Sequence, residues 1–381
     1  MVVQDLLERT RLLQEEITEW RRALHAIPEP GFAEHKTADF LAEKLHAFGY
    51  QIKRGVARTG VVAEIGEGRP RIGIRSEIDG YPVQENLNLA FASRNQGLMH
   101  ACGHDANMAC VMGAAKLLAE SGALDGSIKI LMQPSSESIS EEDNKSGSNK
   151  FVEEGVLDDL DYLISFHVDA TIISGNAGVL SNRGDERSES FSIMVDGGAG
   201  QAMAIASEIV VNLFESTKDQ TTFKELLEVD SIQRQSPERA LVRGRFTNLG
   251  RDTHKFFDNA LKASCQAATQ SCGHFELSYD NEQALFLNCD TVVKVVEQEV
   301  VSLLGEDRCK VVQRKAWSDD FFPYSSRVPS ALLFLGVGLP STPRILHTAS
   351  FDVDESVLHM GTALIYQSVL SLLQDRPEFQ N

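Results

Sequence analysis

The residues best suited to chemistry lie in the segment Met99–Asp105, which reads Met-His-Ala-Cys-Gly-His-Asp. Cys102 and His104 are two residues apart, and the glycine between them allows the backbone to turn tightly. A thiol and an imidazole at this spacing can hold a metal ion or support a nucleophile. The pair alone is weak evidence, because six cysteines and ten histidines in 381 residues could produce it by chance.

Two apolar segments downstream each lead to another potential ligand. Residues 127–132 read as a buried strand that runs into Gln-Pro-Ser-Ser-Glu, the turn containing Glu137. Residues 162–166 read as a second buried strand, followed directly by His167. Ligands in open α/β sheets gather beyond the carboxyl ends of the strands, so we expect both residues to approach the Cys-x-His segment. The alternatives are that Glu137 caps a loop and that His167 is a core histidine.

Four segments together resemble the aminoacylase and carboxypeptidase family of metal-dependent amidohydrolases. They are His-Ala-Cys-Gly-His-Asp at 100–105, Gln-Pro-x-x-Glu at 133–137, Phe-His-Val at 166–168 and Leu-His-Thr-Ala-Ser-Phe-Asp at 346–352. The most similar branch contains the hippurate hydrolases and the plant hydrolases of auxin conjugates. The resemblance extends from residues 20–25 to the last expected helix.

The resemblance implies five metal ligands, and all five are present in register: Cys102, His104, Glu137, His167 and His347. Sulfur, nitrogen and oxygen ligands in this mixture suit one or two divalent ions, zinc or manganese, with water in the open positions. Asp79 matches the family's carboxylate that orients a ligand through hydrogen bonding. The alternative for Asp79 is a strand-end acid in solvent.

The residues that would handle protons depart from the family pattern. The family's general base immediately precedes the ligand glutamate, and here that position is Ser136, which is no base at neutral pH. The contribution of general-base catalysis to the reaction rate, roughly 10²- to 10⁴-fold, should therefore be missing. The lid histidine, which in the family reaches the partner subunit's site to stabilise the oxyanion, corresponds to Gln201. Candidates for a substitute acid are Asp105, Glu141 and Glu142.

Three functions remain compatible with these residues. The first is hydrolysis of an amide in an N-acyl amino acid or a small peptide-like conjugate, with an altered general base. The second is a non-hydrolytic reaction on the same scaffold, such as condensation, cyclisation or elimination on a small amide or amine. The third is a metal-binding homologue without catalysis, which five intact ligands disfavour. Ser136 and Gln201 favour the second function, and the family resemblance favours the first.

Composition limits the partners. A formal net charge of -19 argues against nucleic acid and anionic membranes, because the long-range field repels both. The N-terminus carries an acid where a secretory signal has Lys or Arg, and no apolar run approaches ~18 residues, so we expect a cytoplasmic protein. The cysteines show no framework spacing, which indicates reduced thiols. The expected partner is a small-molecule amide.

A chain of this length exceeds one hydrophobic core, so the sequence predicts two domains. We expect an α/β catalytic domain at 1–184 and 291–381, metallopeptidase-like by resemblance, with a mixed sheet between helices. A smaller α+β domain at 185–290, with an antiparallel sheet, would be inserted in it. The resemblance implies that this insert is a lid that forms a homodimer. Expected catalytic-domain elements are two helices in 5–48, strands at 51–54, 60–65, 71–77 and 331–334, and helices at 107–120, 291–304 and 355–373.

Overall fold

The computed structural model describes residues 3–140, 142–180, 187–198, 200–217, 227–248, 251–270, 273–284, 288–312, 320–338 and 344–374. The chain divides into two compact units. The first comprises Met1–Asn182, Leu287–Gln313 and Asp319–Asn381, and the second comprises Arg183–Phe286 and Arg314–Ser318. The domain boundary expected at residues 181–185 lies outside the described residues.

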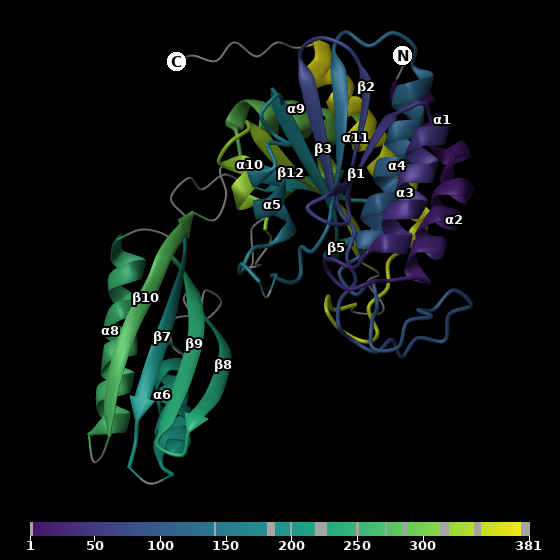
Figure 1. The fold of residues 1–381 in the computed structure, drawn as a ribbon. Coiled ribbons are helices and arrows are strands. Elements are labelled where there is room, and N and C mark those ends of the chain that lie inside the picture. The colour runs from purple at the N-terminus through teal and green to yellow at the C-terminus, as the bar shows by residue number, and fades with distance from the viewer. Residues whose placement is uncertain are drawn as a thin grey trace. The chain divides into compact units, whose positions relative to one another are not determined.

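The first unit is built on a mixed sheet of eight strands in the order β1-β2-β4-β3-β5-β12-β6-β11 (Figure 1). The strands are β1 (Gln51–Val56), β2 (Gly60–Gly66), β3 (Arg71–Glu77), β4 (Ser127–Gln133), β5 (Tyr162–Ile173), β6 (Ala177–Leu180), β11 (Cys309–Val312) and β12 (Ser330–Gly338). The four central strands β4, β3, β5 and β12 run parallel to one another, whereas β2 and β6 pair antiparallel with β4 and β12. Their carboxyl ends therefore meet at one edge of the sheet, which is where ligands gather in such folds.

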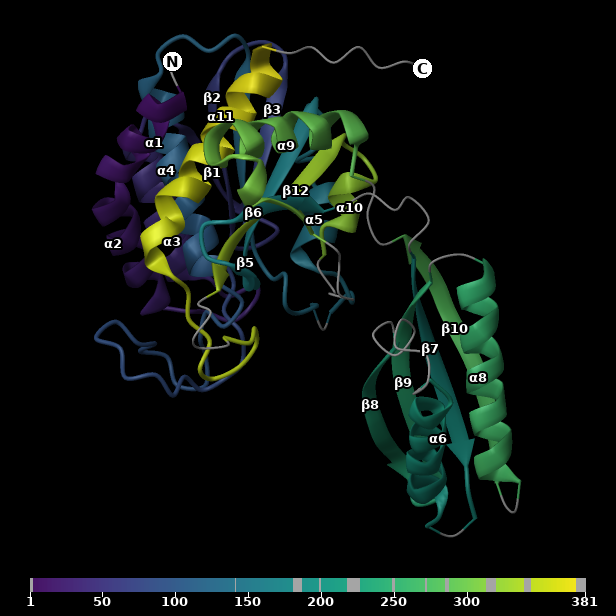
Figure 2. The same ribbon diagram turned by 180° about the vertical axis from the view of Figure 1, so that it is seen from behind.

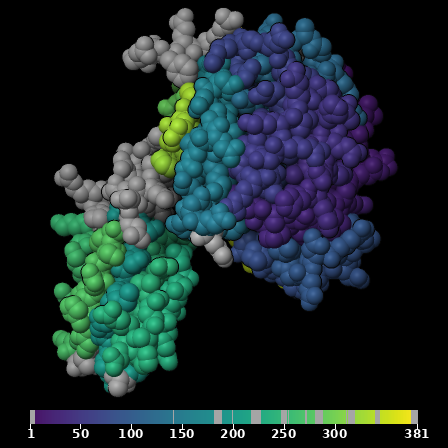
Figure 3. Space-filling view, viewed as in Figure 1, coloured from purple at the N-terminus to yellow at the C-terminus, as the bar shows by residue number. Residues whose placement is uncertain are grey.

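Among the described residues six helices cover one face of this sheet, four of them packed on the strands and α1 and α2 packed on those helices (Figure 2). They are α1 (Val3–Leu12), α2 (Gln14–His25), α3 (His35–Ala47), α4 (His104–Glu120), α9 (Asp290–Leu304) and α11 (Leu358–Gln374). Helix α3 packs on β1 and β2, α4 and α11 pack on β3 and β5, and α9 packs on β6 and β12. In the space-filling view the N-terminal segments, purple and blue, form a continuous surface on the first unit (Figure 3).

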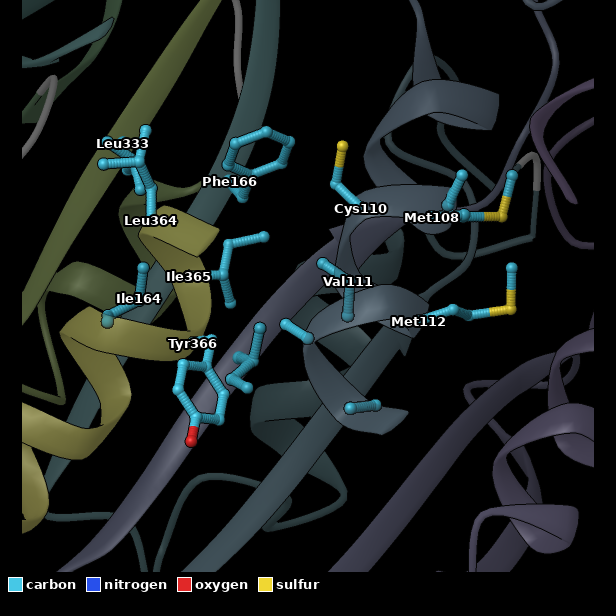
Figure 4. Close-up of a cluster of buried hydrophobic side chains, with 14 of the residues drawn as sticks. Met108, Cys110, Val111, Met112, Ile164, Phe166, Leu333, Leu364, Ile365 and Tyr366 are labelled. Carbon is cyan, nitrogen blue, oxygen red and sulfur yellow. The ribbon is translucent and has the colours of Figure 1, made fainter. Parts of the chain in front are cut away.

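Helices α4 and α11 pack closely against each other, beside Phe166 of β5 (Figure 4). A Cβ atom at Gly361 would lie 2.7 Å from the Phe166 ring and 3.0 Å from the Cys110 sulfur. A Cβ atom at Gly113 would lie 2.6 Å from the hydroxyl of Thr362. Only glycine permits the two helices to come this close, and close packing excludes the voids that destabilise cores.

The opposite face of the sheet is covered by α5 (Gly147–Glu153) and α10 (Phe322–Ser325), which pack together and against β4 and β12. Successive side chains along β4 point to opposite faces of the sheet. Ile128, Ile130 and Met132 belong to the main core, whereas Lys129 points the other way and donates to the carbonyl of Val156, beyond α5. The predicted mixed sheet between helices is confirmed.

Residues 355–374, which include α11, are long and apolar enough to cross a membrane by length and composition alone. About two thirds of that stretch is buried inside the protein, where α11 packs against α1, α4 and α9. Burial of this extent is typical of a core helix.

The second unit has a four-stranded antiparallel sheet in the order β10-β7-β9-β8. Its elements are β7 (Arg187–Asp196), α6 (Ala202–Thr217), β8 (Leu227–Ser236), β9 (Arg239–Asn248), α8 (Arg251–Thr269) and β10 (His274–Ala284). The two helices pack on each other and bury one face of the sheet, around Phe191, Val242 and Phe257. An α+β unit with an antiparallel sheet was predicted, although the sequence did not locate β8.

Several predicted boundaries are wrong. The first expected helix is two helices, α1 and α2, because the N–H of Leu13 bonds to the carbonyl of Thr10 in a tight four-residue turn. Helix α4 begins at His104 rather than residue 107, and β5 continues through His167 to Ile173. The short strands β6 and β11 and the helices α5 and α10 were not predicted, since four to seven residues carry too little periodicity.

Candidate functional site

The Cys-x-His pair lies on a tight turn immediately before α4. Gly103 has φ +87, and a Cβ atom there would lie 2.5 Å from the side chain of Val168. Its carbonyl accepts hydrogen bonds from the N–H groups of Ala106 and Asn107, which starts the helix. The glycine thus makes the turn possible and brings Cys102 and His104 against β5.

The two buried histidines of the site each have one ring nitrogen engaged by a backbone carbonyl. His104 Nδ1 donates to the carbonyl of Asp79 at 2.9 Å, and His167 Nδ1 donates to the carbonyl of Val168 at 2.7 Å. A carbonyl only accepts, so Nδ1 carries a proton in each ring, and Nε2 is the nitrogen that can bind a metal once it is deprotonated. Nε2 of His167 lies 3.6 Å from the sulfur of Cys102. Both rings therefore present the nitrogen that a metal requires.

Glu137 lies on the turn that follows β4, and its carboxylate faces two imidazoles. Its Oε1 is 3.3 Å from Nε2 of His347 and 3.7 Å from Nε2 of His104. Asp79, two residues beyond β3, fixes the backbone of this turn: its Oδ2 accepts the N–H groups of Ser136 and Glu137, each at 2.9 Å. Oδ1 of Asp79 lies 3.2 Å from Nδ1 of His104. One buried carboxylate thus orients two of the predicted ligands.

His347 comes from the chain segment that returns after the second unit. Its backbone N–H donates to the carbonyl of Ala101 at 2.9 Å, directly beside Cys102. Its ring stacks on the ring of Tyr81, with centroids 4.2 Å apart and planes 7° apart. The fifth predicted ligand therefore joins the other four only after distant segments have folded together.

The five predicted ligands form two groups that share one residue. Cys102, His104 and His167 make one group, and Cys102, Glu137 and His347 make the other. Within each group the ligand atoms lie within 4.8 Å of one another. This spacing and the mixture of sulfur, nitrogen and oxygen donors fit one or two divalent ions, which these five residues would hold.

The electrostatics of the site also favour cations. Burial alone would lower the pKa of His104, but its hydrogen bond to Asp79 and the charges of Asp79, Glu77 and Glu137 raise that pKa to about 10. Burial and the nearby carboxylates raise the pKa of the Cys102 thiol. For Glu137, the opposing effect of burial is outweighed by His347 and His104, and its pKa falls to about 2. A negative potential of this kind attracts a divalent ion.

A buried network lies directly behind the ligands. Glu77 accepts a hydrogen bond from Arg75 at 2.5 Å and another from the amide of Asn107 at 3.5 Å. The amide oxygen of Asn107 accepts the backbone N–H of Val168 at 2.9 Å. Burial opposes ionisation of Glu77, but the Arg75 charge and the nearby His167 and His104 lower its pKa. Asn107 therefore ties the end of β3 to β5 next to His167.

Asp105 does not fit the predicted role of substitute acid. The residue is fully buried and accepts hydrogen bonds from Arg21 Nε at 2.7 Å and from His25 Nδ1 at 2.8 Å. Burial would raise its pKa, but the charges of Arg21 and His25 hold that pKa far below the ordinary range. A carboxylate bound in this way accepts protons poorly. The structure assigns Asp105 to fixing α2 against the start of α4.

The other predicted catalytic residues have different environments. Ser136 is half-buried, and its N–H is held by Asp79. Gln201 is exposed and belongs to the second unit, immediately before α6, so its role stays a prediction. Glu141 lies outside the described residues, and Glu142 pairs with Arg58 at the surface.

Two residues near the site were not singled out from the sequence. Tyr81 follows Asp79 by two positions, which is a signal that could have been used, since residues just beyond the carboxyl end of a strand face the site. Glu34 gave no signal, because an acid before a helix is usually a solvated cap. In the structure Glu34 is buried and accepts the backbone N–H of Ser135 at 2.8 Å.

The sequence of this chain is similar to a known protein family and to individual relatives. Residues 73–371 match the family described as Peptidase family M20/M25/M40. The chain is 27% identical over 392 residues to N-acetyl-L-cysteine deacetylase from Bacillus subtilis, covering 96% of this chain and 90% of the relative. It is 26% identical over 387 residues to hippurate hydrolase from Campylobacter jejuni, covering 94% and 97%.

The fold is shared with solved structures. The YxeP protein of Bacillus subtilis, described as a dinuclear metal binding peptidase from the M20 family, superposes with a TM-score of 0.76 at 23% identity. The superposition covers 95% of this chain and 99% of that protein. At this identity the likeness concerns the fold.

Proposed function

Because this chain belongs to peptidase family M20/M25/M40, we propose that it is a metal-dependent amidohydrolase acting on an N-acyl amino acid or a small peptide-like conjugate. The observation that carries this proposal is the convergence of five ligands of three chemical types at one edge of the sheet, in two groups sharing Cys102. The relatives named for N-acetyl-L-cysteine and hippurate support the substrate class, since both compounds are N-acylated amino acids.

The proposed ligands are Cys102, His104, Glu137, His167 and His347, and they would hold one or two divalent ions, zinc or manganese. Such ions supply Lewis acidity toward the amide carbonyl and lower the pKa of water toward ~7. Asp79 orients His104 and the turn that bears Glu137. Ser136 can donate or accept a hydrogen bond but cannot take a proton at neutral pH, so the general base is altered in this chain.

We further propose that the second unit serves as a lid and forms a homodimer, and that the protein is cytoplasmic. The family resemblance supports the dimer, and the composition supports the compartment. The five described cysteines are free thiols, as expected in a reducing compartment.

The hydrolase proposal is tested with the full chain freed of metal, reloaded with zinc or manganese and offered a panel of N-acyl amino acids. We expect slow release of free amine that requires the metal. The variant His104→Ala, which removes one ligand, should lose both a bound ion and the activity. If protein with verified metal content cleaves no amide in a broad panel, the hydrolase proposal is wrong.

Ser136 favours a second candidate function, a non-hydrolytic reaction such as condensation, cyclisation or elimination at the same centre. Hydrolysis adds water to its product, whereas these reactions do not. Turnover in water labelled with oxygen-18 separates them, because only hydrolysis places the label in the product. Any metal-dependent turnover would exclude a purely metal-binding role.

A further inference from the structure

The ligand contributed by the C-terminal segment is the most exposed of the five. Cys102, His104 and His167 are 5%, 1% and 6% exposed as whole residues, and the side chain of Glu137 is 16% exposed. His347 is 35% exposed. It also has φ +62, a left-handed backbone conformation that costs a non-glycine residue free energy unless its surroundings hold it.

Tyr81 supplies such surroundings for the imidazole ring. The two rings are stacked almost in parallel, at 4.2 Å between centroids and 7° between planes. A stack of this kind fixes the plane of the imidazole. Nε2 then lies 3.3 Å from Oε1 of Glu137, within the group that also contains Cys102.

The backbone of Tyr81 is tied to the segment that bears Cys102. Its backbone N–H donates to Met99 at 2.8 Å, and its carbonyl accepts the N–H of Met99 at 3.0 Å. This two-way bridge fixes Tyr81 to the strand-like segment that leads into Cys102. The His347 backbone is bonded to Ala101 in the same segment. Tyr81 and His347 therefore share one rigid support.

We propose that Tyr81 is a positioning residue: its ring holds the imidazole of His347 so that Nε2 points toward Glu137. The consequence of this stack depends on the proposed metal centre: the position for a second ion is already formed before the ion binds. Without the stack, binding an ion at this position must also order an imidazole on an exposed segment. Aromatic stacking and side-chain ordering are each large enough to change affinity by about tenfold.

The decisive variants are Tyr81→Phe, which keeps the ring, and Tyr81→Leu, which removes the stack. Phe48→Leu is the matched control, because Phe48 is also a half-buried ring in the first unit and contacts Trp20. Metal-free proteins are titrated with zinc against a competing chelator. His347→Gln should lose one equivalent of bound zinc, and that equivalent identifies the ion position to which His347 contributes.

We expect Tyr81→Leu to bind that equivalent about tenfold more weakly, with the remaining zinc unaffected. Tyr81→Phe and Phe48→Leu should match the wild type. Unchanged zinc affinity in Tyr81→Leu would overturn the proposal. Weakening of all bound zinc together with a lower Tm would also overturn it, because that pattern indicates a general loss of structure.

A second measurement does not depend on metal. In the metal-free protein the Tyr81 ring current should shift the ring-proton NMR signals of His347 upfield, with His347→Gln providing the assignment. The shift should persist in Tyr81→Phe and disappear in Tyr81→Leu. Identical signals in both variants would refute the stack. Failure of the wild type to bind zinc would instead refute the proposed metal centre and leave this result standing.

Discussion

The carboxylate of Asp79 accepts a hydrogen bond from the backbone N–H of Glu137 at 2.9 Å. Asp79 lies two residues beyond β3 and thus fixes the turn that follows β4, where it also accepts the N–H of Ser136. The backbone carbonyl of Asp79 orients His104. A single residue therefore couples three segments of the site.

Asp79→Asn should weaken the binding of divalent metal by about 10- to 100-fold, as is usual for partners that orient ligands. An amide can still accept one N–H but lacks the charge that favours His104 and the cation. Competition titration with zinc measures the effect. Asp169→Asn is the control, since it makes the same change on β5, where the carboxylate accepts only from Thr171 among its described hydrogen bonds. Equal zinc affinities in the two variants would contradict the expected role.

Ser136→Glu should raise amide hydrolysis by the metal-loaded protein by roughly 10²- to 10⁴-fold, because it restores a proton acceptor beside the ligand Glu137. Release of amine from N-acyl amino acids measures the change. Ser136→Gln has the same size without the basicity and should give no gain. If the wild type already hydrolyses these amides and the glutamate adds nothing, another group is the base.

Arg75→Met should lower the free energy of unfolding by about 3–5 kcal/mol, because it leaves the buried carboxylate of Glu77 without its charged partner. Arg75 also donates to Gln133 at 2.8 Å and to Asp320 at 2.5 Å, so the loss extends to the return segment. Urea denaturation measures the change.

The control for this experiment is Arg54→Met. Arg54 pairs with Asp39 at the surface, where both side chains are exposed, and such pairs contribute only about 0–1 kcal/mol. Similar losses of unfolding free energy in the two variants would show that the Arg75–Glu77 pair stabilises the fold no more than a surface pair does.

Glu34→Gln should make the protein less sensitive to pH. Burial, with a smaller contribution from the Asp79 charge, raises the pKa of Glu34 from 4.5 to about 7. Below about pH 4.5 the carboxyl is protonated in both folded and unfolded chains, and its neutral form stabilises the fold fully. Between pH 4.5 and 7 only the folded chain keeps the proton, so this contribution is lost as pH rises.

The wild type should therefore lose up to about 3 kcal/mol of stability relative to Glu34→Gln between pH 5 and pH 8. Urea denaturation in the presence of a chelator, at both pH values, measures the difference without interference from metal. A constant difference between the two proteins across this range would refute the raised pKa.

The sequence by itself indicated Cys102, His104, Glu137 and His167 as residues of the candidate centre, and the central strands that position them. Strong apolar runs predicted β3, β4 and β5; Glu137 lies beyond the end of β4, whereas His167 lies within β5. Such features are local, because burial and period are properties of a few consecutive residues. The family pattern then added His347, which no local feature marks.

Only the tertiary structure decided how these residues are used. Asp105 looked available as an acid, yet Arg21 and His25, about 80 residues away in the sequence, bind it in the core. Tyr81 and His347 are separated by more than 260 residues and stack ring on ring. Contacts between distant segments set burial, charge and ring orientation, and no pattern within one segment encodes them.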